Sequence, residues 1–332
     1  MRAAKLFSWA SLVLSSVASE HSIWPLGNGF EIAVDKQTNH LFITQRGSTI
    51  WDTVPGQSFL GASAGDDIIL ESSGNFKIEQ VDRNKCENQQ VTQVSHRAWN
   101  DSFNDRAVVI SGHLTSCGDE TSKFWVAFWV PLNLSDRVAF HVNVNPVDTS
   151  ADPLNKIFLT YRSLETEDFY GLGGQASFSS LKNQTVPIFS REQGVGRGDQ
   201  PTTRLEDADS FFSGGNKFTT YTAVPQYISS TARVFHLTQE STAYANFDFR
   251  DPLAVTMRYD ALNVSGYFMQ ANNILNGISM LTEYTGRMTD LPRWVDSGAV
   301  LGIQGGQEKV NKIVKEGLQQ KCPIAGVWLQ DW

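Results

Sequence analysis

The sequence has few of the residues on which metal, redox and nucleophilic sites are commonly built. Only three of its 332 residues are cysteines and six are histidines, and the histidines are scattered without the spacing of zinc ligands. No Gly-x-Ser-x-Gly elbow is present, which argues against a serine nucleophile of the α/β-hydrolase type. No Gly-Lys-Ser/Thr follows the glycine-rich segments, so a phosphate cradle is not expected. We therefore expect neither a metal nor a cofactor.

An excess of positive charge is also lacking. The formal net charge is -8, so no basic stripe is expected to meet nucleic acid or an anionic membrane. After the N-terminal stretch, no segment approaches the roughly 18 unbroken apolar residues of a membrane-spanning helix. With 41% hydrophobic and 19% charged residues, the mature protein is expected to be soluble and globular, with its oligomeric state left open.

The N-terminus has the layout of a secretory signal peptide. Met1 to Lys5 carries positive charge, Leu6 to Val17 is apolar with small residues, and small residues follow up to Ser19. The apolar run is too short to span a membrane. We predict a signal peptide over residues 1–19 and a secreted, extracellular protein.

Four N-glycosylation sequons agree with a secreted protein. Their asparagines are Asn100, Asn133, Asn183 and Asn263. Cys86 and Cys117 flank a region of strand-like pattern, and we predict that they form a disulfide in an oxidising compartment. Cys322 then has no mate in this chain. The alternative is that all three cysteines are free.

The pattern of residues 20–268 is typical of short β-strands. Residues 30–34 and 41–44 predict a hairpin. Further strands are predicted at 106–112, 124–130, 138–144, 157–162, 227–237, 243–250 and 254–259. Short strands at this spacing indicate a β-sandwich domain over residues 20–268. A helix begins near Asn272 and ends at Gly286, within a predicted linker helix at 269–290.

Residues 291–332 predict a different architecture. An apolar run at 298–303, a helical pattern from Val310 to Leu318 and a further apolar run at 324–329 follow in order. Two apolar strands joined by a helix predict a parallel pair covered on its faces, with Trp328 in the core. A (β/α)8 barrel takes about 250 residues. The pattern therefore predicts the first βαβ unit of a barrel that is incomplete in this chain; the alternative is a unit that decorates an all-β protein.

Two glycine-rich segments, 169–175 and 190–199, are predicted to be shaped loops, because glycine permits positive φ and close backbone approach. The residues left for chemistry are carboxylates, amides and indoles, which suit a sugar: oxygens accept from hydroxyls and indoles cover the C–H faces of a ring. The candidate substrate-binding residues are Glu192, Gln193, Arg197, Gln304, Gln330, Asp331 and Trp332.

Four segments together resemble a known family. They are 170–175 (Tyr-Gly-Leu-Gly-Gly-Gln), 192–197 (Glu-Gln-Gly-Val-Gly-Arg), Thr-Gly-Arg at 285–287 before Leu-Pro-Arg-Trp at 291–294, and 328–332 (Trp-Leu-Gln-Asp-Trp). In order and spacing they resemble glycoside hydrolase family 31, and segment 192–197 is most similar to the sulfoquinovosidase branch of that family. Two positions depart from the family pattern: Gly174 stands where the family usually has a glutamate, and Leu329 where α-glucosidase members carry an acid.

The resemblance implies a galactose-mutarotase-like β-sandwich followed by a (β/α)8 (TIM) barrel that hydrolyses α-glycosides with retention. It implies two catalytic aspartates on barrel strands beyond the second, so no catalytic residue is expected in this chain and the chain alone is expected to be inactive. It also places the Glu192 loop in the sugar site. The predicted function is thus a secreted retaining α-glycosidase, for an α-glucoside or sulfoquinovoside-type substrate, represented by its N-terminal fragment. The alternatives are a non-catalytic carbohydrate-binding module or a truncated gene product.

Overall fold

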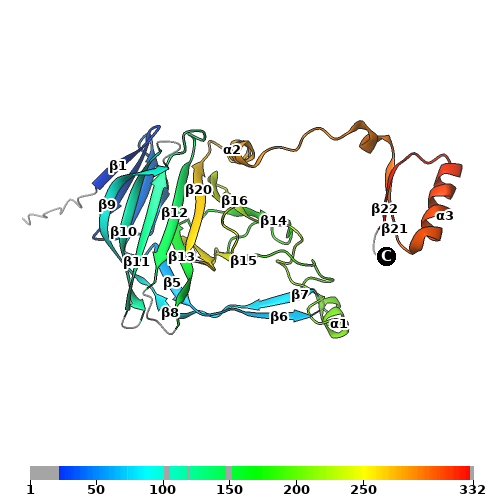
Figure 1. Cartoon of the computed structure of the whole chain (residues 1–332), viewed down its shortest axis with the longest axis horizontal. Coiled ribbons are helices and arrows are strands. Elements are labelled where there is room, and N and C mark those ends of the chain that lie inside the picture. The colour runs from blue at the N-terminus through cyan, green and yellow to red at the C-terminus, as the bar shows by residue number, and fades with distance from the viewer. Residues whose placement is uncertain (1–21, 73, 101–104, 118–119, 147–151, 330–332) are drawn as a thin grey trace, which may run out of the picture. The chain divides into compact units, whose positions relative to one another are not determined.

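The structure is a computed structural model that describes residues 22–72, 74–100, 105–117, 120–146 and 152–329; the side chains of 98–100, 105–106, 116–117 and 120–121 are also outside the description. The chain divides into two compact units, Met1–Tyr284 and Thr285–Trp332, and each is described by itself. The first is mostly β-sheet, as Figure 1 shows. The predicted signal peptide at 1–19 lies outside the described residues.

Two large antiparallel sheets and two smaller ones form the first unit. The eight-stranded sheet has the order β14-β16-β17-β20-β12-β11-β10-β9 and the six-stranded sheet the order β15-β18-β19-β13-β5-β8, with β1 to β4 in a four-stranded sheet and β6 and β7 in a ribbon. The bounds are β1 Ser22–Gly27, β2 Phe30–Asp35, β3 His40–Gln45, β4 Ser48–Asp52, β5 Leu60–Ala64, β6 Ile68–Ser72, β7 Asn75–Glu79, β8 Arg83–Cys86, β9 Asn88–Asn100, β10 Asp105–Cys117, β11 Glu120–Trp129, β12 Val138–Asn145, β13 Leu154–Arg162, β14 Phe169–Gly173, β15 Thr185–Ile188, β16 Ala223–Ser229, β17 Arg233–Leu237, β18 Ala245–Asp248, β19 Ala254–Tyr259 and β20 Asn263–Gln270.

Most predicted strands are confirmed, including the hairpin of β2 and β3. The single strand predicted at 227–237 is wrong, because β16 and β17 form a hairpin there. Its turn contains neither glycine nor proline, and Ala232 takes the left-handed conformation (φ 61°) instead, so the sequence carries no strong turn signal. Residues 169–173, predicted as a loop, form strand β14. Gly171 and Gly173 have positive φ and allow an irregular pairing with β16.

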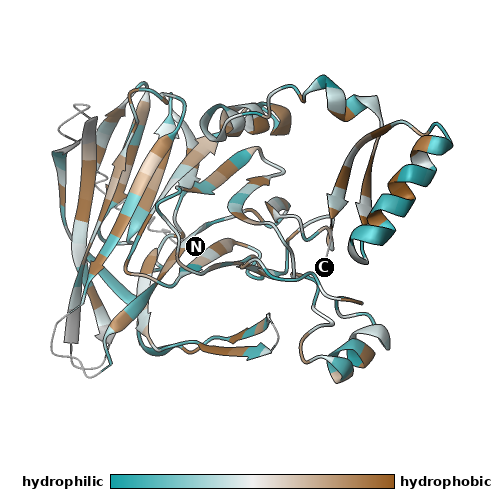
Figure 2. Cartoon of the chain, turned by 45° about the vertical axis from the view of Figure 1, so that its right-hand side comes forward, coloured by the Kyte–Doolittle hydropathy of each residue, from teal (hydrophilic) through white to brown (hydrophobic). Residues whose placement is uncertain are grey.

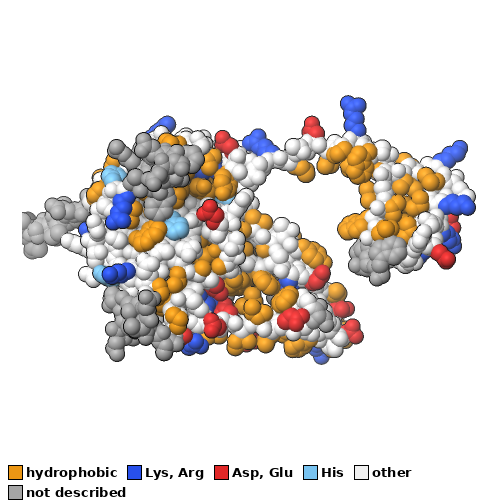
Figure 3. Space-filling model, in the orientation of Figure 1, with side chains coloured by type: hydrophobic (Ala, Val, Ile, Leu, Met, Phe, Trp, Pro, Cys, Tyr) orange, Lys and Arg blue, Asp and Glu red, His pale blue; other side chains and the backbone are white. Residues whose placement is uncertain are grey.

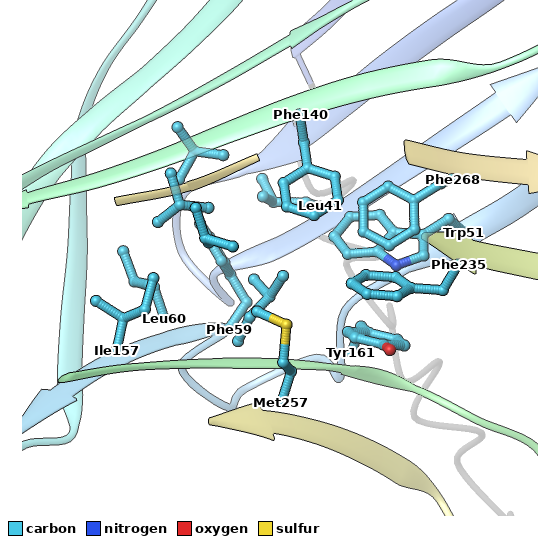
Figure 4. Packing of buried hydrophobic residues seen from close by; sticks show 14 of the residues in the cluster. Leu41, Trp51, Phe59, Leu60, Phe140, Ile157, Tyr161, Phe235, Met257 and Phe268 are labelled. Atoms are coloured by element: carbon cyan, nitrogen blue, oxygen red, sulfur yellow. The ribbon is translucent and has the colours of Figure 1, made fainter. Parts of the chain in front are cut away.

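Side chains from both large sheets meet in one core, because alternate residues of each strand point to it. Tyr161 of β13 stacks on Phe235 of β17, with ring centroids 5.7 Å apart at 14°. Trp51 packs on Phe268 of β20, and Figure 4 shows these rings together with Met257. The Tyr161 hydroxyl is not left unpaired, since it lies 2.7 Å from the Tyr227 hydroxyl.

The ribbon of β6 and β7 projects from the sheets (Figure 1) and is anchored at its base by buried charges. The Arg258 guanidinium donates to both oxygens of Asp67, at 2.8 and 2.9 Å, just before β6. It also lies 3.5 Å from Asp82, just after β7, and 3.5 Å from Asp260. Lys156 Nζ is 3.4 Å from Asp67. Arg258 of β19 and Lys156 of β13 thus hold the base of the ribbon, where β6 begins and β7 ends.

Helix α2 (Ile274–Thr285) lies within the range predicted as a linker, and it packs on the first unit. It ends at Thr285, and the positive φ (85°) of the next residue, Gly286, agrees with the predicted helix end. A Cβ on Gly277 would lie 2.6 Å from Ile228 Cδ1 and 3.1 Å from Val234 Cγ2, so a larger residue here would force these side chains of β16 and β17 to shift. The fully buried Arg137 donates to the Met280 carbonyl at 3.0 Å.

The second unit contains the predicted strand, helix and strand. It consists of a 3-10 helix (Arg293–Ser297), β21 (Ala299–Ile303), α3 (Gly306–Gln319) and β22 (Ile324–Leu329), and β21 and β22 pair in parallel as predicted. Figure 2 shows the strands as largely hydrophobic and α3 as mostly hydrophilic. The prediction of Trp328 as core is wrong: it is 63% exposed, because one helix cannot cover both faces of a two-stranded pair. Figure 3 shows hydrophobic side chains exposed on this unit.

The described residues also bear on the predicted modifications. Asn133, Asn183 and Asn263 are at least partly exposed, and the side chain of Asn100 is outside the description. Cys86 is buried and disulfide-bonded. The side chain of Cys117 lies outside the description, so their pairing stays a prediction. Cys322 is free and exposed. No helix among the described residues is long and apolar enough to cross a membrane.

Candidate functional site

The candidate site lies in the long segment between β15 and β16, residues 189–222, which we call the Glu192 loop. The prediction that its glycines allow close backbone approach is confirmed. Gly194 (φ 82°) packs against the backbone of Gly215, so that a Cβ on Gly194 would lie 2.6 Å from it. Gly196 (φ 90°) lies equally tightly against Thr203, at the start of helix α1 (Thr202–Asp209). The loop therefore holds a defined shape.

At the surface of this loop, Glu192 is paired with a tyrosine that lies 29 residues further along the chain. The Tyr221 hydroxyl donates to Glu192 Oε2 at 2.6 Å. Both side chains are exposed, Tyr221 to 61%. The hydrogen bond to the carboxylate raises the pKa of Tyr221. A carboxylate has about four lone-pair sites, so the pair retains acceptor capacity for a hydroxyl-rich ligand.

Next to Glu192, the Arg191 side chain ties the loop to the β6–β7 ribbon. Its guanidinium donates to the Phe76 carbonyl and, at 3.2 Å, to Asn75 Oδ1, both in β7. It also donates to the Phe212 carbonyl within the loop. Burial lowers the pKa of Arg191, with Asp207 acting against the shift. Arg191 thus fixes the backbone from which the Glu192 carboxylate projects.

A cavity of about 320 Å³ lies beside Arg191, between the ribbon and the loop. Five aromatic residues in the described part of the chain contribute to its walls, among them Phe76, which lies edge-on to Phe189 with ring centroids 5.9 Å apart, and Tyr244. Asp207 and Asn216 add polar groups. Glu192 and Tyr221 do not line this cavity. The cavity is therefore separate from the exposed Glu192–Tyr221 pair.

Glu192, Gln193 and Arg197 all lie in this loop, and each contacts a different partner. Arg197 Nη2 donates to the Gln175 carbonyl at 2.6 Å and to Ser177 Oγ at 3.1 Å, so it braces the loop against the segment after β14. The Gln193 carbonyl accepts from the Thr219 hydroxyl. A substrate contact by either residue stays a prediction.

The remaining predicted site residues belong to the second unit or lie outside the description. Gln304 is exposed and follows the carboxyl end of β21. Gln330, Asp331 and Trp332 lie outside the described residues. The described β22 ends at Leu329, so a position for these three at a strand end stays a prediction.

Tyr221 is a site residue that the sequence pattern did not predict. A tyrosine between Thr220 and Thr222, just before a predicted strand, was the available signal. Its partner could not be found from spacing alone, because the loop folds back on itself over 29 residues.

The comparisons with known proteins add two findings in sequence, although no protein-family model matches the chain. A sulfoquinovosidase of Escherichia coli (strain K12) is 29% identical over 178 residues, which are 54% of this chain and 26% of that protein. A sulfoquinovosidase of Agrobacterium fabrum is 27% identical over 184 residues, which are 54% of this chain and 27% of that protein. The match spans about a quarter of the length of these curated relatives.

In fold, the chain is similar to a family 31 sulfoquinovosidase from E. rectale, solved in complex with the aza-sugar inhibitor IFGSQ. The TM-score is 0.72 at 23% identity, over 91% of this chain and 41% of that chain. These three proteins, which match in sequence or in fold, are all sulfoquinovosidases. The resemblance to glycoside hydrolase family 31 is therefore confirmed, in sequence over about half of the chain and in fold over most of it.

Proposed function

We propose that the chain forms the N-terminal β-sandwich and the first βαβ barrel unit of a secreted family 31 glycosidase that cleaves α-linked, sulfoquinovoside-type glycosides with retention. The observation that carries the proposal is the exposed Glu192–Tyr221 pair on a loop fixed by Arg191. The matches to sulfoquinovosidases in sequence and fold support the choice of substrate class.

In this proposal Glu192 binds the sugar and does not take part in bond cleavage. Its carboxylate accepts hydrogen bonds from ring hydroxyls, while Tyr221 holds it in one orientation. A side chain oriented before the substrate arrives loses less conformational freedom on binding. Tyr221 also presents an aromatic ring that can contact the C–H face of a sugar.

Retaining hydrolysis needs two carboxyl groups about 5 Å apart across the scissile bond. We assign these to the two aspartates that the family resemblance places on later barrel strands, not to this chain. The chain alone is then expected to turn over no aryl α-glycoside. Gln304, which follows β21, and Asp331, which lies outside the described residues, are assigned to substrate binding.

The test is an assay of the whole secreted protein with 4-nitrophenyl α-sulfoquinovoside and 4-nitrophenyl α-glucoside, with the product anomer followed by NMR. We expect turnover of the sulfoquinovoside in preference to the glucoside, and an α-anomer as the first product. A whole protein that is folded and binds sulfoquinovose but cleaves neither substrate would instead be a sugar-binding module.

A further inference from the structure

A row of polar and aromatic side chains lies on the outer face of the eight-stranded sheet, the face turned away from the core. In β10 and β11 alternate residues enter the core, among them Val108, Ile110 and Phe124. The residues between them therefore point outward. The strand register places Ser111 opposite Trp125 and His113 opposite Lys123 on this face. A polar and aromatic row thus crosses these strands.

Two indoles on this face lie over small residues. Ala107, Val109 and Ala127 are buried, and Trp125 and Trp129 pack against them. With such small side chains beneath, the indoles can approach the sheet closely and present a surface rather than filling a core. This outer layer is separate from the main core.

The orientation of the Trp125 ring is fixed by a histidine. The Trp125 indole stacks on the His141 imidazole, with centroids 5.0 Å apart at 21°. His141 Nδ1 in turn lies 2.6 Å from the Ser265 hydroxyl on the next strand. Burial lowers the pKa of His141, with Glu240 acting against the shift. A ring held in this way is a preorganised stacking surface.

A hollow of about 580 Å³ opens beside Trp125. Arg97 and Lys123 give its walls positive charge, and His113 and Asn145 add hydrogen-bonding groups. No carboxylate is among the described residues that line it. Lys36 brings a further positive charge to this hollow, because its Nζ donates a hydrogen bond to the carbonyl of the lining residue Thr92 at 3.3 Å.

One wall group has unused hydrogen-bonding capacity. His113 Nδ1 is buried and has no hydrogen-bond partner among the described residues. Buried polar atoms in folded proteins are nearly always paired, so this nitrogen is open to a further hydrogen bond, and His113 is one of the residues that line the hollow.

We propose that this hollow is a second saccharide-binding site, which takes a sugar ring bearing an anionic group such as a sulfonate, a sulfate or a carboxylate. The indole covers the C–H face of the ring, Asn145 and His113 bond hydroxyls, and Lys123 with Arg97 meets the anion. The site is distinct from the Glu192 loop. Strands β17, β20 and β12 lie between β16, which follows that loop, and β11, which carries Trp125. The proposal does not rest on the proposed catalytic function.

The experiment uses the 332-residue chain and two probes that differ only in a 6-sulfate group, glucose 6-sulfate and glucose, titrated by ligand-observed NMR. We expect glucose 6-sulfate to bind more tightly than glucose. Trp125→Ala and Lys123→Gln should each weaken it by about ten-fold, the equivalent of about 1.4 kcal/mol. Binding should persist in Glu192→Gln, which removes the carboxylate of the other site.

Lys312→Gln is the matched control, because Lys312 is an exposed lysine of the second unit, 73% accessible. Lys123 is also exposed, so its variant keeps the test decisive if Trp125→Ala does not fold. Equal affinity of the chain for glucose 6-sulfate and for glucose would overturn the proposal. So would unchanged affinity in Lys123→Gln, or loss of binding in Glu192→Gln alone.

Discussion

The hydroxyl of Tyr221 and the carboxylate of Glu192, 29 residues apart in sequence, form a 2.6 Å hydrogen bond at the surface of the first unit. This contact closes the two ends of the Glu192 loop on each other. It gives the carboxylate a fixed direction although both side chains are exposed. The proposed sugar contact depends on that direction.

Tyr221→Phe should therefore lower kcat/KM of the whole enzyme for a sulfoquinovoside by about three- to ten-fold, since one hydrogen bond to a charged group is lost. The melting temperature should not change, because Tyr221 is 61% exposed. The control is Tyr284→Phe, which removes a hydroxyl hydrogen-bonded to Tyr267 and lies in α2, far along the chain from the loop. An equal loss of activity in both variants would contradict a specific role for Tyr221.

Arg191→Met should loosen both the loop and the ribbon. It leaves the Phe76 and Phe212 carbonyls without this donor, and each unsatisfied group costs about 1–3 kcal/mol when buried. We expect a fall in melting temperature of several degrees, and faster hydrogen exchange across residues 68–79.

The matched control for Arg191 is Arg250→Met. Arg250 pairs with Asp248 at the surface and is 68% exposed, so its loss should cost about 1 kcal/mol or less. If amide hydrogen exchange across residues 68–79 is as slow in Arg191→Met as in Arg250→Met, Arg191 does not hold the ribbon.

The buried charges at the base of the ribbon predict a pH dependence of stability. Burial raises the pKa of Asp260 from 3.8 to about 7, with help from Asp67 and against the attraction of Arg258. A carboxyl with a raised pKa in the folded state contributes stability that is complete below its unfolded value and is lost as pH rises through about 7. Asp67, whose pKa is lowered, acts in the opposite direction and only at acidic pH.

Asp260→Asn cannot titrate, so its melting temperature should fall less than that of the wild type between pH of about 6 and 8. Asp152→Asn is the control: the hydrogen bond from Arg83 lowers the pKa of Asp152, which stays ionised throughout this range. If the melting temperature changes with pH equally in the wild type and in Asp260→Asn, Asp260 does not take up a proton on folding.

Strands with strict alternation and the helices with apolar spacing could be predicted from the sequence, as β12 and α3 show. Helix α1 could not, because Thr202–Asp209 has no apolar stripe and is held by backbone contacts to Gly196 and Gly214 instead. The ribbon was missed because Ile68–Ser72 is exposed and follows no two-sided pattern. Propensity and periodicity do not encode elements that tertiary contacts impose.

Of the candidate site, the local part could be predicted. The glycines around Glu192 signal a backbone that must come close to another segment, and the structure supplies that segment at Gly214 and Gly215. Tyr221 could not be predicted, since the contact that defines its role crosses a long loop. The same holds for Arg191, whose partners Asn75 and Phe76 lie more than a hundred residues earlier.

The most direct measurement is kcat/KM of the whole enzyme for a sulfoquinovoside, in the wild type, Glu192→Gln and Asp331→Asn. We predict a loss of about ten-fold or more in Glu192→Gln with unchanged expression and melting temperature, because charge-assisted hydrogen bonds to sugar hydroxyls contribute about 1.5–3 kcal/mol each. An unchanged kcat/KM in Glu192→Gln, together with a strongly reduced kcat/KM in Asp331→Asn, would contradict the proposed role of Glu192. The sugar site would then belong to the barrel alone.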